Sequence, residues 1–214
     1  MSTKGRKWTI VLIALVLLVI DQAIKFYIKL NFAYGQGFEM FGHSHWAQIL
    51  FIENNGMAFG MQLGGVWGKI LLSSLRVILI AALIWYINHL INKGKAPWGV
   101  VIGMTMVLVG AVGNMIDSAF YGLIFSESSY GTVATMVPFG QGYAPFLQGK
   151  VVDMFYFPMM HWVWPEWMPW VGGNEFEFFR PIFNFADACI TCGVIYMILF
   201  QRKYFARTDK KKDN

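Results

Sequence analysis

Four long apolar runs, each interrupted by few polar residues, dominate the pattern along this chain of 214 residues. They cover about residues 8–28, 69–91, 98–120 and 186–205. A helix needs about 20 apolar residues to cross a hydrocarbon core about 30 Å thick. The pattern therefore predicts an all-α membrane protein with four transmembrane helices. The first run resembles a signal peptide, but Asp21 and Gln22 follow it instead of a small-x-small cleavage site, so we expect an uncleaved anchor.

Two longer segments, 31–68 and 121–182, connect the spans on one side. The first is rich in glycine and contains a strand-like stretch at 46–52, which predicts a small β-rich segment at the membrane surface. Its Asn55-Gly56 pair is equally typical of a simple hairpin turn. The second segment holds most of the tryptophans, which favour the membrane interface. No room is left for a separate soluble domain, so residues 1–214 are predicted to form a single domain.

Small residues on the third run predict close helix packing. Gly99 and Gly103 have the G-x-x-x-G spacing that lets two helix backbones approach, and Gly110 and Gly113 extend the series. We therefore expect a neighbouring helix to lie against this face.

The composition is 57% hydrophobic and only 14% charged, which is typical of a membrane protein. The net charge of +5 comes from basic residues gathered at a few chain positions, so it does not indicate a nucleic-acid surface. This clustering is the positive-inside pattern and places both termini in the cytoplasm. The basic residues concerned are Lys4, Arg6, Lys7, Lys93, Lys95, Arg202, Lys203, Arg207 and Lys210 to Lys212.

Cysteine and histidine give no support for redox or metal chemistry. Cys189 and Cys192 form a C-x-x-C inside an apolar run without a nearby basic group, so we interpret them as packing residues. The four histidines have no metal-ligand spacing. We expect neither a metal nor another cofactor.

Ionisable groups within the apolar runs are the strongest functional signal, because each costs roughly 2.5 to 3.5 kcal/mol to insert into a membrane. Asp21 and Lys25 are four residues apart and predict an ion pair on one helix face. An alternative is that this pair only closes the span at the membrane surface. With four spans, all the intramembrane carboxylates fall at the outer end, which favours a shared polar site. The residues at this depth are Asp21, Arg76, Asn114, Asp117 and Asp187, and Asp153 can reach them from the outer loop.

A pair of carboxylates is the main catalytic resource at this site. When two carboxylates lie close, repulsion and burial keep one protonated while the other is ionised. The ionised member can then activate a water for attack on an amide. Asp153 and Asp187 are the predicted pair, with Asp153 the more readily protonated. The rival from another class is a small ion- or proton-coupled transporter or channel, which would need charges through the full membrane thickness.

Five motifs occur in the order found in the bacterial lipoprotein signal peptidases, or signal peptidase II, and the sequence resembles that family. They are Asp21-Gln22 with Lys25, Asn54 to Phe59, Gly113 to Asp117, Val151 to Asp153, and Phe183 to Asp187. The resemblance implies an aspartic endopeptidase that cleaves signal peptides from lipid-modified prolipoproteins, with Asp153 and Asp187 as the catalytic pair. By the same resemblance, residues that bind substrate or support the site are Asn54, Gly56, Asn114, Asp117, Asn184, Ala186, Asp21 and Lys25.

The resemblance also implies a location and partners. We expect a multi-pass protein of the bacterial inner membrane whose site faces the periplasm. Its partners are prolipoprotein substrates and membrane lipids, and a monomer is expected.

Two features depart from the family pattern. Ser118 stands where the family has an arginine, so Asp117 is predicted to pair with Arg76 or Arg180. The aromatic loop from Phe155 to Arg180 is unusually long, and we hypothesise that it folds over the site as a lid.

Overall fold

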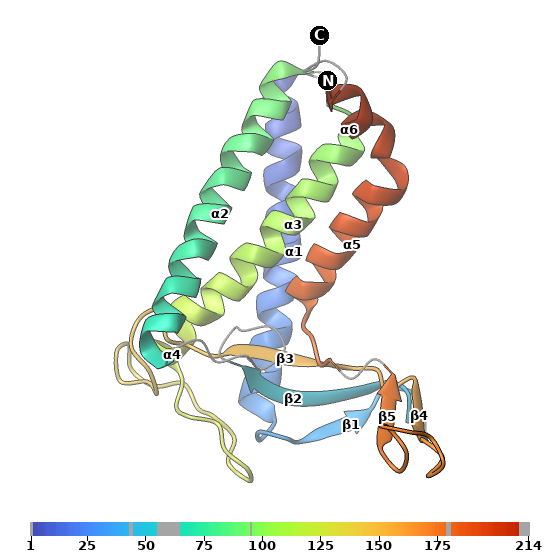
Figure 1. Ribbon diagram of the computed structural model, residues 1–214. Helices are drawn as coiled ribbons and strands as arrows, with labels where there is room; N and C mark the ends of the chain where they lie inside the picture. Colours follow the sequence, from blue (N-terminus) through green and yellow to red (C-terminus); the bar gives the residue numbers. More distant parts are fainter. Residues whose placement is uncertain (1, 43–44, 55–64, 95, 179–180, 210–214) are drawn as a thin grey trace.

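The computed structural model describes residues 2–42, 45–54, 65–94, 96–178 and 181–209. Long helices stand side by side, with a small sheet at one end of them and both chain termini at the other (Figure 1). The long helices are α1 (Thr3–Asn31), α2 (Gly65–Lys93), α3 (Trp98–Ile116) and α5 (Phe185–Phe200). This arrangement confirms a predominantly helical membrane protein that carries a small sheet.

Three of these helical segments are long and apolar enough to cross a membrane: Thr3–Asn31, Leu71–Lys93 and Trp98–Ile124. Helix α5 ends at Phe200, whereas the fourth apolar run was expected to reach about residue 205. Helix α5 has 16 residues, or about 24 Å at 1.5 Å per residue. It stops because Gln201 leaves the helical conformation with φ −115° and ψ 6°. A separate short helix, α6 (Arg202–Asp209), follows it.

Helices α3 and α5 pack most closely, and glycine makes this possible. A Cβ atom on Gly110 would lie 2.2 Å from the carbonyl oxygen of Ala186, and one on Gly193 would lie 2.6 Å from that of Gly103. Both distances are far inside van der Waals contact, so no larger residue fits without separating the helices. The predicted small-residue face of the third span is confirmed, and α5 is the helix that it contacts.

The sheet joins two distant parts of the chain. Strands β1 (Gly37–Glu39), β2 (Gln48–Asn54) and β3 (Val151–Tyr156) are antiparallel in the order β1-β2-β3. The strand expected at 46–52 is confirmed as β2, whereas β3 was not anticipated. In the register of β2 and β3, Asn54 pairs with Val151 and Ile52 with Asp153. The alternative hairpin turn at Asn55-Gly56 lies outside the described residues.

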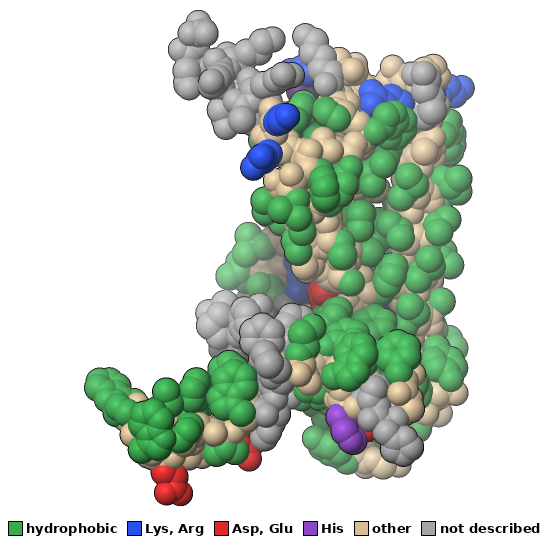
Figure 2. Space-filling view, turned by 90° about the vertical axis from the view of Figure 1, so that its right-hand side faces the viewer, with side chains coloured by type: hydrophobic (Ala, Val, Ile, Leu, Met, Phe, Trp, Pro, Cys, Tyr) green, Lys and Arg blue, Asp and Glu red, His purple; other side chains and the backbone are tan. Residues whose placement is uncertain are grey.

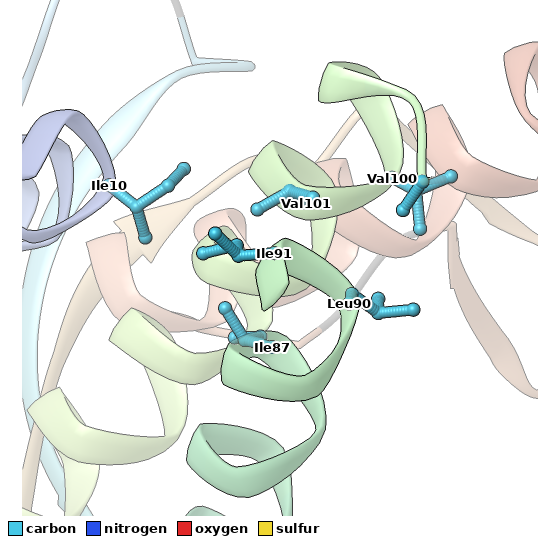
Figure 3. Close-up of a cluster of buried hydrophobic side chains, with 7 residues drawn as sticks. Ile10, Ile87, Leu90, Ile91, Val100 and Val101 are labelled. Atoms are coloured by element: carbon cyan, nitrogen blue, oxygen red, sulfur yellow. The ribbon is translucent and has the colours of Figure 1, made fainter. Parts of the chain in front are cut away.

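Two apolar clusters hold this arrangement together. One closes the end with the termini and contains Ile10, Ile87, Leu90, Ile91, Val100 and Val101 (Figure 3). The other joins the sheet to the helices and contains Ile28, Ile49, Phe51, Tyr121, Phe125, Val152 and Met154. Between them many apolar side chains on the helices point outward, such as Leu12, Ile78 and Ile198. This outer surface suits lipid contact, because hydrocarbon imposes no cost on exposed apolar atoms.

The long aromatic loop contains a two-stranded hairpin of β4 (Met160–Val163) and β5 (Glu175–Phe178). It projects sideways from the end of the three-stranded sheet (Figures 1 and 2). Neither strand packs extensively against another described helix or strand. The hypothesis of a lid over the site is not supported by this placement.

Candidate functional site

A π-helical turn shapes the site at the end of α3. This helix continues into η2 (Asp117–Tyr121) and then α4 (Gly122–Ile124). Strand β3 is docked against the turn, because the Gly149 amide donates to the Ser118 carbonyl at 2.8 Å. A Cβ on Gly149 would lie only 2.2 Å from the Asp117 carbonyl oxygen. A glycine at this position therefore allows the segment leading to β3 to approach the turn that carries Asp117.

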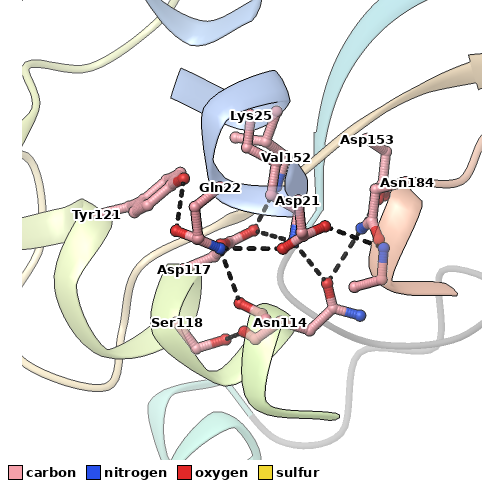
Figure 4. A network of polar contacts seen from close by, with 12 residues as sticks. Asp21, Gln22, Lys25, Asn114, Asp117, Ser118, Tyr121, Val152, Asp153 and Asn184 are labelled. Carbon is pink, nitrogen blue, oxygen red and sulfur yellow. Dashed lines mark hydrogen bonds and ion pairs between the residues drawn. The ribbon is translucent and has the colours of Figure 1, made fainter. Parts of the chain in front are cut away.

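Lys25 forms the centre of a fully buried ionic cluster (Figure 4). Its ammonium lies 3.1 Å from a carboxylate oxygen of Asp21 and 2.9 Å from one of Asp117. It also donates to the Asn114 side-chain oxygen at 2.9 Å. The predicted Asp21–Lys25 pair is confirmed, and both side chains are fully buried.

Lys25 supplies the positive charge in direct contact with Asp117, a partner that the sequence did not predict. Arg76 instead donates to the Ser118 hydroxyl at 3.3 Å. It lies near enough to both Asp187 and Asp117 to interact with them electrostatically. The other candidate, Arg180, lies outside the described residues. Lys25 takes the role because it enters the same buried layer from α1.

The two carboxylates bound to Lys25 also hold the backbone on either side of the site. Asp21 accepts from the Ala186 amide at 2.9 Å, and Asp117 accepts from the Val152 amide at 3.3 Å. Each of these amides belongs to the residue just before a predicted catalytic aspartate. The ionic cluster therefore fixes the chain entering Asp187 and the chain entering Asp153 at the same time.

Gln22 satisfies the remaining polar atoms of this layer. Its amide nitrogen donates to Asp21 at 3.0 Å and to Asp117 at 3.0 Å. Its oxygen accepts from the Tyr121 hydroxyl at 3.1 Å. Every buried polar side-chain atom of the described residues has a hydrogen-bond partner. Buried polar networks are most rigid when they are fully satisfied, so this layer is preorganised.

Asp153 and Asp187 are brought together by asparagine side chains. Asn184 donates to Asp153 at 2.6 Å, and Asn54 donates to the other oxygen of Asp153. Asn114 donates to Asp187 at 2.8 Å. The Asn184 amide nitrogen also donates to the Asn114 oxygen, at 3.1 Å, which links the two halves.

The position of Asp187 follows from the local sequence. Asn184 is the N-cap of α5 and accepts from the Asp187 amide at 3.0 Å, while the Asp187 carboxylate accepts from the Asn184 amide. This reciprocal pair is a capping box. It holds the half-buried carboxylate in the first helical turn, where the helix dipole favours a negative charge.

Asp153 lies in a different environment, on β3 and only 2% exposed. Burial, and after it the charge of Asp187, raises the pKa of Asp153 to about 7, although hydrogen bonds from Asn184 and Asn54 act in the opposite direction. A proton on Asp153 at neutral pH is therefore compatible with the structure.

The structure gathers nearly all the predicted site residues in one layer. They are Asp21, Lys25, Asn54, Asn114, Asp117, Asp153, Asn184, Ala186 and Asp187. Gly56 lies outside the described residues. Among the described residues, no group of three His, Cys, Asp or Glu side chains is arranged to hold a metal ion.

A second buried ion pair was missed. The ammonium of Lys29 is fully buried, bonds to the Glu53 carboxylate and donates to the Ser128 hydroxyl at 2.9 Å. The sequence spacing could have indicated that Lys29 is buried in the same layer, because Asp21, Lys25 and Lys29 are each four residues apart and share one helix face.

Comparison with known proteins decides the family. The model of the family described as signal peptidase (SPase) II matches residues 13–202. The chain belongs to the signal peptidase II family. The resemblance drawn from its five motifs is thereby confirmed, and membership in this family implies a protease.

Relatives extend the similarity over most of the chain. A lipoprotein signal peptidase of Porphyromonas gingivalis is 42% identical over 197 residues, which cover 92% of this chain and 84% of that protein. One from Amoebophilus asiaticus is 34% identical over 195 residues, covering 91% and 78%. A solved bacterial membrane enzyme has the same fold, with a TM-score of 0.61 at 24% identity and coverage of 93% and 90%.

Proposed function

We propose that this signal peptidase II family member is a membrane-embedded aspartic endopeptidase that removes signal peptides from lipid-modified prolipoproteins. Family membership supports removal of signal peptides from prolipoproteins. The observation that supports the aspartic mechanism is the link through Asn184, whose side chain donates to the Asp153 carboxyl group and whose backbone amide donates to the Asp187 carboxylate. It sets two carboxyl groups in different environments beside one another, as a general acid and a general base require.

The proposed reaction uses one water between the two carboxyl groups. Asp187 accepts a proton from the water as its oxygen attacks the carbonyl carbon of the scissile amide. Protonated Asp153 donates a hydrogen bond to the carbonyl oxygen, where negative charge develops. When the tetrahedral intermediate collapses, the carbon–nitrogen bond breaks and the proton held by Asp187 passes to the leaving amine. Asn114, Asn184 and Asn54 hold the carboxyl groups in place and do not titrate.

The charge distribution supports an orientation. Blue Lys and Arg side chains gather at the end that carries the termini (Figure 2). Lys4 at the start of α1, Lys93 at the end of α2 and Arg202 at the start of α6 belong to this end. The polar layer lies at the opposite end, next to the sheet. By the positive-inside rule, we place both termini in the cytoplasm and the site toward the periplasmic side of the bacterial inner membrane. If α5 crosses the membrane together with its flanking residues, the chain has four transmembrane segments. We also expect the protein to be a monomer surrounded by membrane lipids.

The transporter alternative is not favoured. A path through the membrane would need polar groups along its whole length. Among the described residues, the buried charges are confined to the sheet half of the helices: Asp21, Lys25, Lys29 and Asp117. A site at one end fits a substrate whose signal sequence lies in the membrane and whose cleaved bond lies near its surface.

The proposal is tested with purified enzyme and a lipid-modified prolipoprotein, by measuring the released signal peptide. Asp153→Asn and Asp187→Asn are each expected to abolish release while the protein still folds. Glu127→Gln is the matched control, because Glu127 is exposed and lies on the same side of the molecule. Near-normal release by either aspartate variant would remove that residue from the mechanism.

A further inference from the structure

The β4–β5 hairpin carries a set of aromatic side chains that the proposed reaction does not use. Trp162 lies opposite Phe176 across the two strands, with ring centroids 4.3 Å apart. Trp164 packs edge-on against both rings, at 5.4 and 5.9 Å. Because Trp162 and Trp164 are two residues apart, this aromatic trio occupies one face of the hairpin. Val163 and the exposed Glu175 occupy the other face.

The tip of the hairpin, residues 164–174, is folded by its own backbone. The Trp164 amide donates to the Asn174 carbonyl at 3.0 Å, and the Gly173 amide donates back to Trp164 at 2.9 Å. This ordered tip nevertheless displays Trp167 and Trp170, which are 78% and 98% exposed. Trp170 also has a φ of 78°, an unfavourable conformation for a bulky residue. Within the described chain, neither indole is covered.

The distribution of charged and hydrophobic side chains on the hairpin indicates what covers Trp167 and Trp170. The hairpin from Phe157 to Phe178 contains no lysine or arginine, whereas Glu166 and Glu175 are exposed. In Figure 2 the projecting hairpin shows hydrophobic side chains on the side toward the helices and acidic side chains on the opposite side. Its hydrophobic side therefore faces the region surrounding the apolar outer surface of the helices. That region is the bilayer, and indole rings concentrate at its headgroup level.

We propose that the β4–β5 hairpin is a second membrane contact, whose tip places Trp167 and Trp170 in the headgroup layer of the outer leaflet beside the helices. The acidic side remains in water. Since the hairpin has no basic residue, its contact comes from indole burial and is insensitive to salt, unlike that of a polybasic segment. The contact would hold the sheet that carries Asp153 at a fixed height above the membrane.

The test uses the full-length protein in phosphatidylcholine vesicles that contain brominated lipid, which quenches nearby tryptophan. Subtracting the spectrum of the Trp167→Phe, Trp170→Phe double variant from that of the parent isolates the emission of these two indoles. We expect this emission to be blue-shifted and to lose roughly half its intensity to bromine near the headgroups, but less to bromine near the chain ends. High salt should leave the quenching unchanged.

Controls make the result decisive. Trp8→Phe supplies a positive control, because Trp8 is exposed on the first turns of α1. The proposal would be overturned if the difference emission spectrum were red-shifted, quenched by aqueous iodide and not quenched by bromolipid, because this result would place the hairpin in water. Protection from both quenchers would instead indicate a protein partner, such as a second copy, and would also overturn it. None of these readouts depends on peptidase activity.

Discussion

Replacing Lys25 with methionine removes the ammonium that contacts both Asp21 and Asp117. Methionine keeps an unbranched side chain of similar length, so the main change is the loss of charge. Both carboxylates are fully buried and keep only their bonds from Gln22 and from backbone amides. Two negative groups are then left together in a layer that excludes water.

The expected loss of stability is large. Removing one partner of a buried ion pair costs about 3 to 5 kcal/mol, because the remaining charge is uncompensated. Lys25 contacts two carboxylates and the Asn114 oxygen, at 3.1, 2.9 and 2.9 Å, so a value at the upper end is expected. Activity should fall as well in the protein that remains folded. Lys25 fixes the oxygen of Asn114, which leaves its nitrogen to donate to Asp187.

The assay is reversible unfolding in mixed micelles, with the free energy of unfolding compared between variants. Lys4→Met is the matched control, because Lys4 is exposed on the same helix and should change little. Adding Asp21→Asn and Asp117→Asn to Lys25→Met should recover much of the stability, since no unpaired charge remains, without restoring activity. If Lys25→Met alone costs less than about 1 kcal/mol, as an exposed pair would, the cluster does not hold the site together.

Three further outcomes follow from particular contacts. The pKa of Asp153 is raised to about 7 in the folded protein. Its contribution to the free energy of unfolding is therefore fully present at acid pH and is lost as the pH rises toward 7. When the free energy of unfolding is measured across that range, Asp153→Asn should lack this pH-dependent loss. Gly110→Ala should separate α3 from α5 and destabilise the protein by about 1 to 3 kcal/mol in the same unfolding assay, since its Cβ meets the Ala186 carbonyl. Lys29→Met should cost about 3 to 5 kcal/mol by leaving Glu53 buried without its ammonium, and adding Glu53→Leu should recover part of it.

The helices and the position of the polar residues along them were predictable because both depend on local properties. A long apolar run has few alternatives to a transmembrane helix, and its boundaries at Trp98 and Lys93 follow from flanking polar residues. Likewise, the cost of an intramembrane charge singles out Asp21 and Asp117 whatever the rest of the fold. Hydropathy alone does not register the change of backbone conformation at Gln201, directly after the end of α5.

The hydrogen-bond and ion-pair partners of the site residues were less predictable, since they depend on contacts between distant segments. An α-helix turns by about 100° per residue, so the extra residue of a π turn changes which neighbours Asp117 and Ser118 face. Nothing local in the sequence marks η2. Strand β3 could not be anticipated either, because it pairs with β2, about a hundred positions earlier in the chain. The Lys25–Asp117 pair and the contact of Asn54 with Asp153 both rest on these two features.

Lys25 therefore positions Asp153 and Asp187 indirectly, through its contacts with Asp21 and Asp117. Through Asp21 it holds the Ala186 amide, one residue before Asp187, and through Asp117 it holds the Val152 amide, one residue before Asp153. The first link fixes a helix N-terminus and the second fixes a strand, so neither aspartate can shift without disturbing the same buried layer. Such a layer costs free energy to bury, and this cost is consistent with a site that must hold two carboxyl groups in fixed positions. The buried ionic cluster thus holds the backbone amide one residue before each of the two groups proposed to perform the chemistry.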